Sequence, residues 1–508
     1  MLVYFKSDTL ISTQTKYYSN SSDTIKCFFT GQITNINPLR KKLEKAGIYL
    51  ESVNPSNIII SLYLTCGDAF VKDLDGKFAF IIIDTINKTV FAARDRFGCE
   101  PLYYTQLTDG IGFTTDFFEL KEMLKINSYE MNYPVLNQYF DGGFIDEENT
   151  VIKNVLMLPA GCYLFYNSTS KIIEPFTYLL TFEGSCDNLA CEKSIYEVIK
   201  SNLKKYLKSD LTYGILYTGQ LTELVMIYLV KQAGFDIRVF STELSTLKRT
   251  GVNELNIDVI HIHEVVDNAQ YLHATKQALK LLSSPIYDKD IGYKYLNYKM
   301  ASKYVDKILS VAGADLYFEE FRPRLKFSKK VLKKLLIDED DPFITQDFEY
   351  FEQIHSIEKN LRNQTLEVNS FLKGSTIREN HDIANHFDLD IIFPFLDIEI
   401  FEEIRMINYS DKINMKLFKK IFDLEIKNCA NLKSIHGRKQ DALPIKKWIK
   451  NEYYSEIKKL FDDELVDVLF CRSSLYKILE SHVAGFKNYD EEIWSIVQFL
   501  MWFNHFVR

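Results

Sequence analysis

One stretch of the chain would place backbone donors where a phosphate could bind. Residues 213–230 read Tyr-Gly-Ile-Leu-Tyr-Thr-Gly-Gln-Leu-Thr-Glu-Leu-Val-Met-Ile-Tyr-Leu-Val, which predicts a buried strand, a tight turn at Gly219 and an amphipathic helix that stops before Gly234. A strand that turns sharply into a helix directs unpaired N–H groups at one point, and nucleotide phosphates bind at such points. The turn is therefore a candidate phosphate site.

The elements around this turn predict a parallel, doubly wound sheet. Further strands are expected at 238–241, 257–265 and 307–311, separated by helical stretches, and a second glycine turn follows at Gly313. In such sheets ligands bind beyond the carboxyl ends of the strands, which is where both glycine turns fall. Beyond residue 324 we expect mostly helix.

The N-terminal part has a different pattern. Strands at 77–83 and 89–94 are joined by a polar turn, and further short strands alternate with helices at 38–47, 54–66 and 117–124. This order predicts a sandwich of sheets with flanking helices. A polar stretch at 183–188 is the best linker candidate, so we expect one domain at 1–182 and a second at 190–508.

Composition excludes several classes of protein. The 508 residues carry a net charge of −8, and 46% of them are hydrophobic, which is typical of a globular protein and argues against a basic nucleic-acid binder. The longest apolar runs, 78–83 and 391–396, are far shorter than a membrane span, and the N-terminus lacks a signal layout, so we expect a cytoplasmic protein. The eight cysteines include no C-x-x-C pair, which predicts reduced thiols and no structural metal.

Four patches together resemble one family. Residues 75–84 (Asp-Gly-Lys-Phe-Ala-Phe-Ile-Ile-Ile-Asp) and 93–104 (Ala-Arg-Asp-Arg-Phe-Gly-Cys-Glu-Pro-Leu-Tyr-Tyr) are similar to the "DGxFAF…ARDxxGxxPLYY" run of glutamine-dependent asparagine synthetases. The turn at 218–223 lies where that family has its "SGGxDS" pyrophosphate loop. Residues 313–315 match the start of "GxDELFGGY", and 393–397 match "PFLD". The chain is identified as a divergent member of the superfamily that also includes β-lactam synthetases and lasso-peptide cyclases.

The resemblance implies an α/β fold in two parts. The first is a glutaminase-like, Ntn-type αββα sandwich, and the second is a doubly wound, ATP-pyrophosphatase-like synthetase domain. If the chain is active, ATP and Mg²⁺ are the implied cofactors.

The resemblance also implies that glutamine hydrolysis is lost. Family glutaminases use a cysteine directly after the initiator Met, with its own α-amino group as the base. Position 2 is Leu2, and Cys27, the nearest cysteine, is internal. The family's "NGE" oxyanion segment aligns with Thr-Gly-Gln at 30–32, and its glutamine-binding acid aligns near Pro55. We therefore expect an inactive glutaminase-like domain in which Arg94 and Asp95 are structural.

The pyrophosphate loop is altered as well. By resemblance, Thr218 and Gly219 keep a hydroxyl and a close backbone approach, whereas Gln220 replaces a glycine. Thr222 replaces the carboxylate that holds Mg²⁺, and Glu223 places a negative charge beside the phosphates. Two like charges about 4–5 Å apart repel by roughly 3–4 kcal/mol at an effective dielectric near 20. Glu223 either weakens nucleotide binding or has become a Mg²⁺ ligand.

Other site residues follow from the same resemblance. Gly313 and Asp315 keep the nucleotide turn and a Mg²⁺ ligand, but Ala312 stands where active members have Glu or Tyr. Lys439 matches a catalytic lysine that acts on the adenylated intermediate; the alternative is a solvated lysine in a Lys-rich loop. Ser241 lies where adenosine binds, and Glu243 could contact a substrate amine. His261 and His263 are expected to be structural, without further metal ligands.

Two functions from different classes remain open. The first is a pseudo-synthetase that keeps the fold as a scaffold for a protein or peptide partner in a biosynthetic pathway. The second is an ATP-dependent ligase that adenylates a small-molecule or peptide carboxylate and closes an amide, as β-lactam synthetases and peptide cyclases do. A nucleotide-binding regulator without turnover is a third possibility. The separate departures at Ala312, Thr222 and Glu223 favour the pseudo-synthetase.

Overall fold

A computed structural model gives the arrangement of the chain. It describes residues 1–6, 9–12, 17–50, 52, 54–123, 130–146, 148–178, 188–246, 257–318, 335, 372–405, 407, 415–429 and 443–508. The linker predicted at 183–188 lies almost wholly outside these residues, and α5 begins at Asn188. None of the described helices combines the length and the apolarity that crossing a membrane requires.

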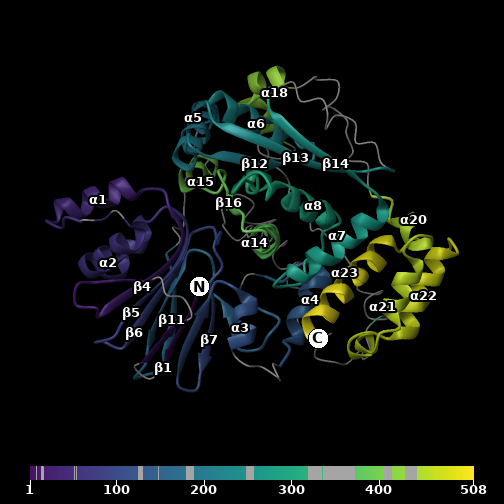
Figure 1. Cartoon of the computed structure of the whole chain (residues 1–508), viewed down its shortest axis with the longest axis horizontal. Helices are drawn as coiled ribbons and strands as arrows, with labels where there is room; N and C mark the ends of the chain where they lie inside the picture. Colours follow the sequence, from purple (N-terminus) through teal and green to yellow (C-terminus); the bar gives the residue numbers. More distant parts are fainter. Residues whose placement is uncertain are drawn as a thin grey trace.

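The N-terminal part is a sandwich of two antiparallel sheets, as predicted (Figure 1). The five-stranded sheet has the order β2-β1-β8-β7-β9 and the six-stranded sheet the order β11-β10-β6-β5-β4-β3. Their strands are β1 Leu2–Lys6, β2 Thr9–Ser12, β3 Tyr18–Ser19, β4 Ile25–Ile33, β5 Gly76–Asp84, β6 Thr89–Arg94, β7 Tyr103–Leu107, β8 Gly110–Thr114, β9 Val155–Met157, β10 Cys162–Asn167 and β11 Ile172–Thr177.

Alternating side chains explain the layers of the sandwich. On β5, Ala79, Ile81 and Ile83 face the other sheet, while Phe78, Phe80 and Ile82 pack toward α1 (Ile36–Lys45) and α2 (Pro55–Cys66). Both faces of β5 are therefore apolar, which is why residues 78–83 form a continuous hydrophobic run.

Helices on the other side of the sandwich connect it to the rest of the chain. The core that contains Phe117 of α3 (Phe117–Met123) and the apolar residues of α4 (Tyr133–Gly142) continues into the C-terminal half. Tyr139 of α4 donates its hydroxyl to the backbone oxygen of Ser495 in α23 (Asp490–Val507), at 2.8 Å. Packing therefore joins part of the 1–182 segment to the second domain.

The second sheet is parallel and doubly wound, as predicted, with strand order β14-β13-β12-β15-β16. This order places the first strand in the middle and winds the chain outward in both directions. The strands are β12 Thr212–Leu216, β13 Asp236–Leu244, β14 Ile260–Val266, β15 Lys307–Leu309 and β16 Asp390–Ile392. The short β16 adds a strand within the region expected to be mostly helical.

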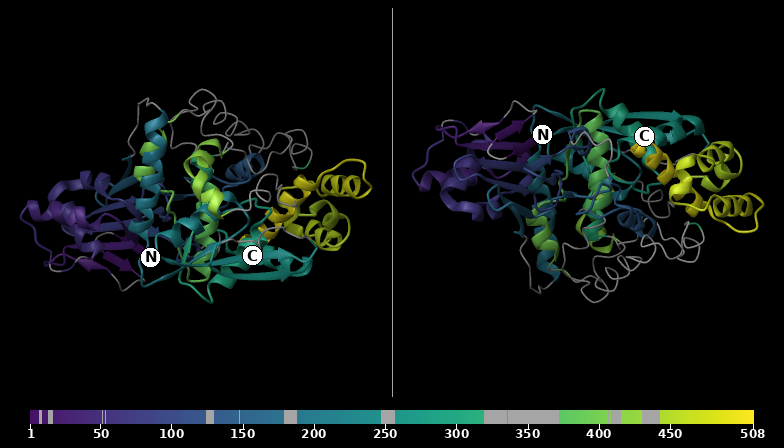
Figure 2. Two further views of the ribbon diagram at one scale, coloured as in Figure 1. Left: turned by 90° about the horizontal axis from the view of Figure 1, so that it is seen from above. Right: turned by 90° about the horizontal axis from the view of Figure 1, so that it is seen from below.

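Helices cover both faces of this sheet (Figure 1). Helices α6 (Leu221–Gln232) and α18 (Asp423–Cys429) lie on one side, and α7 (Asn268–Leu281), α8 (Ile291–Ala301) and α14 (Arg378–His386) lie on the other. The remaining longer helices are α5 Asn188–Tyr206, α15 Ile398–Arg405, α20 Ile445–Lys450, α21 Tyr454–Phe461 and α22 Arg472–Val483. Figure 2 shows α20–α22 at the end of the molecule opposite the sandwich.

Candidate functional site

The turn after β12 has the backbone geometry that the sequence predicts. Gly219 has a φ of +94°, a left-handed conformation that L side chains rarely adopt, and α6 begins two residues later at Leu221. The backbone N–H groups just before α6 therefore point into the turn, where the positive end of the helix dipole favours an anion.

The anion that occupies this turn is the carboxylate of Glu223. Its Oε2 accepts hydrogen bonds from the backbone N–H groups of Thr218 (2.7 Å), Gly219 (3.1 Å) and Gln220 (3.0 Å). Its Oε1 accepts a fourth bond from the Thr218 hydroxyl at 2.9 Å. Three consecutive backbone donors and one hydroxyl thus converge on one side chain of the same loop.

Glu223 is shielded from solvent. Its side chain is buried, at 5% exposure, and burial raises its pKa to about 7, although the hydrogen bonds from the loop act in the opposite direction. The neighbouring Thr222 hydroxyl is also buried and has no hydrogen-bond partner among the described residues. A phosphate oxygen could reach the loop donors only by displacing the Glu223 carboxylate.

The second glycine turn has a packing role. Gly313 has a φ of +97°, and a Cβ at this position would lie 2.5 Å from Cδ2 of Leu396. The turn therefore packs directly on the 393–397 segment, and Ala312 beside it is buried. Asp315 lies in α9 (Ala314–Phe318), but its side chain is outside the described part of the chain, as is all of Lys439.

Two predicted binding residues lie in a cluster that the sequence did not anticipate. The Ser241 hydroxyl lies 2.7 Å from Nε2 of His261 and 2.8 Å from Nδ1 of His263. Glu243 lies 3.5 Å from Nε2 of His263. The available signal was the strand register, because parallel pairing sets Ser241 beside His263. Tyr217, the residue before the loop, contacts His261 edge-on, with ring centroids 6.4 Å apart.

The described residues contain no preformed cluster of metal ligands. They contain no group of three or more His, Cys, Asp or Glu side chains arranged to hold a metal ion. Glu223 directs its carboxylate at backbone donors, and those donors are not metal ligands. The Mg²⁺ roles of Glu223 and Asp315 stay predictions.

The N-terminal positions named by the resemblance are built into regular structure. Leu2 lies in β1 and is buried, and Cys27 lies in β4 with no solvent exposure. Burial raises the pKa of Cys27 to about 12, so its thiol is a poor nucleophile near neutral pH. Residues 30–32 pair with β5, and Pro55 occupies the first turn of α2.

Arg94 and Asp95 hold the turn that follows β6. Arg94 donates to the backbone oxygens of Gly98 (2.7 Å), Glu100 (2.7 Å) and Leu158 (2.8 Å). Asp95, which is fully buried, accepts N–H bonds from residues 78, 97, 99 and 100. These contacts fit the structural role expected for both residues.

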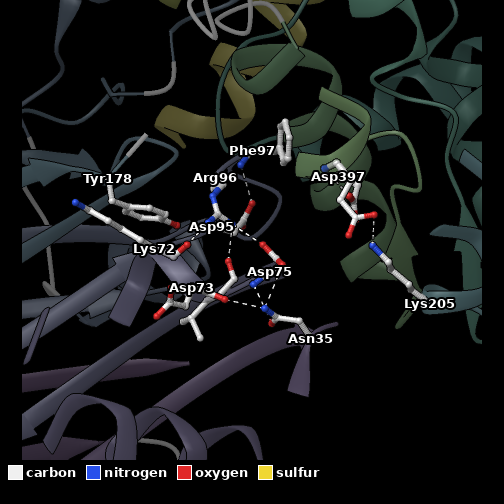
Figure 3. Close-up of polar contacts among 12 residues, drawn as sticks. Asn35, Lys72, Asp73, Asp75, Asp95, Arg96, Phe97, Tyr178, Lys205 and Asp397 are labelled. Carbon is white, nitrogen blue, oxygen red and sulfur yellow. Dashed lines mark hydrogen bonds and ion pairs between the residues drawn. The ribbon is translucent and has the colours of Figure 1, made fainter. Parts of the chain in front are cut away.

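Two of the family-like patches meet at the domain boundary (Figure 3). Asp75 accepts a 2.7 Å bond from Arg96 and a 3.1 Å bond from Asn35, while Asp397 approaches from the second domain. Burial raises the pKa of Asp75, and the nearby charge of Asp397 raises it further against the pull of Arg96. Asp397 accepts a 3.3 Å bond from Tyr206 of α5.

A partly buried ion cluster crosses the same boundary. Lys77 of β5 pairs with Glu100 at 3.3 Å and with Asp390 of β16, 313 positions away in the sequence. Burial acts to lower the pKa of Lys77, but the two carboxylates outweigh it and raise the pKa above its usual range. Lys307 of β15 also pairs with Asp390. The two domains are thus joined by charge as well as by apolar packing.

Comparison with known proteins settles the family. A model described as a glutamine amidotransferase domain matches residues 12–177. A second, described as asparagine synthase, matches residues 245–504, slightly more than half of the chain, and begins beyond the 218–223 loop. The chain belongs to the asparagine synthase family.

Similar proteins span nearly the whole chain at low identity. The glutamine-hydrolyzing asparagine synthetase 1 of Bacillus subtilis (strain 168) is 21% identical, with 95% of this chain and 86% of that protein covered. A putative glutamine-hydrolyzing asparagine synthetase of Mycobacterium bovis is 20% identical, with 94% and 84% covered. The solved glutamine phosphoribosylpyrophosphate amidotransferase of B. subtilis covers 47% of this chain and 50% of its own, at 12% identity and a TM-score of 0.24, too low to define a shared fold.

Proposed function

We propose that this chain is a pseudo-synthetase. It keeps the fold of the asparagine synthase family as a scaffold that binds a protein or peptide partner in a biosynthetic pathway, and it forms no acyl-adenylate. The pyrophosphate loop is closed by its own side chain, and the N-terminal domain hydrolyses no glutamine.

The observation that carries this proposal is the position of Glu223. A nucleotide phosphate would have to compete with a covalently attached carboxylate that already accepts the N–H groups of Thr218, Gly219 and Gln220. Displacing it would leave a buried carboxylate beside a polyphosphate, and like charges at that distance repel by several kcal/mol. The loop therefore favours the ligand-free state.

The loss of glutamine hydrolysis has independent support. Leu2 is an aliphatic residue in β1, and Cys27 is a fully buried residue in the middle of β4. Neither supplies a thiolate with an adjacent free amine. Incubation of the purified protein with glutamine should therefore release no glutamate above a no-protein control.

The decisive experiment is a titration with Mg-ATP by calorimetry, with and without EDTA, followed by an assay for AMP and pyrophosphate. We expect no binding up to millimolar ATP and no AMP. ATP binding without AMP release would indicate a nucleotide-dependent regulator instead of a scaffold. AMP release with a carboxylate substrate would establish the alternative, an ATP-dependent amide-forming ligase.

Substituting Glu223 tests the physical reason. In Glu223→Ser the three backbone donors become free and the negative charge is removed, so Mg-ATP affinity should rise at least tenfold, a gain of about 1.4 kcal/mol or more. Glu402→Ser, on the exposed side of α15, is the matched control and should leave affinity unchanged. Weaker binding in Glu223→Ser would instead show that Glu223 holds the metal.

The ligase alternative has its own test at Lys439. If AMP is released, Lys439→Ala should abolish its release while ATP affinity stays within a few-fold, because a mobile cation acts on the developing charge rather than on ground-state binding. Unchanged turnover would remove Lys439 from the mechanism.

A further inference from the structure

Four polar side chains form a row across the two outer strands of the parallel sheet, beside the pyrophosphate loop but separate from it. Ser241 and Glu243 come from β13, and His261 and His263 come from β14, the edge strand. All four lie on one face, because Thr242 points the other way and donates to Asn297 of α8 at 2.6 Å. The α6 side of the sheet therefore carries the row.

The hydroxyl of Ser241 bridges the two rings. It lies within hydrogen-bond distance of one nitrogen of each ring, at 2.7 Å (His261) and 2.8 Å (His263). A hydroxyl has one proton to donate and can accept two bonds, so the Ser241 proton is bonded within the row only while one of those two ring nitrogens is unprotonated.

The two rings have different charged neighbours. Glu243 of β13 pairs with His263 at 3.5 Å, and His261 faces the neutral phenol ring of Tyr217 from β12. Helix α6, which covers this face, carries Glu223, whose carboxylate is turned into the loop, and Lys231 in its last turn. The other charged side chains of the two strands point elsewhere. Asp236 accepts a 3.2 Å bond from Thr212, Arg238 lies over Tyr304, and Glu264 alternates to the opposite face of β14.

Strand β14 is attached to the sheet on one side only. As an edge strand it pairs with β13 alone, and its Ile260 and Val265 side chains are each 57% exposed. Val266 is buried and Ile262 packs against the core, so the row adds to the backbone pairing and to this limited apolar contact.

We propose that Ser241, His261, His263 and Glu243 form an acid-sensitive latch that fastens β14 to the sheet. When both of these nitrogens carry a proton, the Ser241 hydroxyl has no acceptor within the row. When both rings are charged, two positive rings lie side by side, with centroids 5.8 Å apart. The strand then detaches more readily. This inference goes beyond the proposed scaffold function and does not depend on nucleotide binding.

The sign of the pH response follows from the burial of His261. Burial, and then the charge of His263, lower the pKa of His261 below its usual value of 6.5. The attached strand therefore binds the proton less tightly than the detached strand does. Acid below about pH 6.5 shifts the equilibrium toward detachment, and no effect is expected at higher pH.

Hydrogen–deuterium exchange of the full chain tests the latch. The measured quantity is the protection of the amides of residues 257–266, corrected for the intrinsic pH dependence of exchange, at about pH 7.5 and about pH 5.5. We expect β14 to lose about tenfold in protection at the lower pH, while the central strand β12 changes less than twofold.

Three variants separate the latch from general acid sensitivity. In His261→Gln the side-chain amide can still donate to Ser241 but cannot gain a charge, so protection of β14 should be equal at both pH values. The control His273→Gln changes an exposed histidine on α7 and should keep the full acid response. Ser241→Ala, which removes the bridge, should make β14 exchange rapidly at both pH values.

Three results would overturn the proposal. They are a wild-type protein whose β14 is equally protected at both pH values, a His261→Gln variant that keeps the wild-type acid response, and a Ser241→Ala variant in which β14 stays as protected as in the wild type. If His261→Gln does not fold, Ser241→Ala still tests the proposal. Alanine is close to serine in size, so this substitution removes the bridging hydroxyl without disturbing the packing.

Discussion

At the scale of single residues, Glu223 defines the state of the candidate site. A glutamate at the third position of a helix commonly folds back to cap the helix N-terminus, and here the same contact fills an anion-binding turn. The side chain thus stabilises the fold locally while it occupies the donors that a phosphate would need. Burial makes the contact sensitive to pH.

The stability contribution of Glu223 should depend on pH. Its pKa is raised from the usual 4.5 to about 7, so the folded chain holds this proton more tightly than the unfolded chain. The contribution is therefore most favourable below about pH 4.5 and is lost as the pH rises through about 7, a change of up to about 3 kcal/mol. Glu223→Gln removes this dependence.

Urea denaturation of wild type and Glu223→Gln at about pH 4.5 and about pH 8 provides the measurement. The variant should gain stability relative to wild type between the lower and the higher pH. Glu402→Gln, an exposed substitution on α15, should show no such trend. A relative stability of Glu223→Gln that is constant or falls with pH would contradict the expectation.

At the scale of secondary-structure elements, buried side chains replace missing backbone partners. In the turn after β6, Asp95 accepts three N–H groups at 3.0 Å, and it accepts a fourth from Phe78 of β5 at 3.3 Å. Arg94 donates to the carbonyl groups nearby. This explains why a charged Arg-Asp pair lies in the interior of the sandwich. An enzymatic role is not needed to account for it.

Removing the Asp95 carboxylate should therefore be costly. Asp95→Ala leaves four buried N–H groups without acceptors and should destabilise the protein by about 3–5 kcal/mol. Asp95→Asn keeps one acceptor oxygen and the shape of the side chain, so its loss should be smaller. The midpoint of urea unfolding measures both. An Asp95→Ala variant within about 0.5 kcal/mol of wild type would show that the turn has other acceptors.

At the scale of the whole molecule, side-chain packing and ion pairs join the two domains. Helix α4 from the N-terminal segment packs on α23 near the end of the chain, with Phe140 and Phe499 rings 5.0 Å apart. Lys77 adds a partly buried cation between Glu100 and Asp390, one from each domain.

Breaking the ion cluster should uncouple the domains. Lys77→Met leaves Glu100 without this cation and Asp390 with Lys307, and should cost about 1–3 kcal/mol. The three tryptophans, Trp448, Trp494 and Trp502, all report on the C-terminal helices, whereas far-ultraviolet circular dichroism reports on both domains.

In the wild type, tryptophan fluorescence and circular dichroism should report unfolding at the same urea concentration. In Lys77→Met the midpoints of the two unfolding curves should separate. The control Lys41→Met, on the exposed side of α1, should keep them together. Coincident midpoints in Lys77→Met would show that apolar packing alone couples the domains.

Local sequence determined most of the framework. Alternating apolar residues specified β5 and β6 and the polar turn between them, because side chains of a strand point to alternate faces. Helical periodicity and glycine placed α6 between Gly219 and Gly234, since both glycines adopt positive φ angles. Family-like patches fixed the two-part fold, and the family comparison confirmed it.

Only the tertiary structure decided what the site contains. The sequence predicted a negative charge near the loop. It did not predict the direction of the Glu223 side chain, because that direction depends on three backbone donors that converge at one point. It treated His261 and His263 as isolated, because their partner Ser241 comes from another strand. Lys77 and Asp390, 313 positions apart, meet only when both domains are folded. Such contacts arise from packing over long separations, and no local periodicity records them.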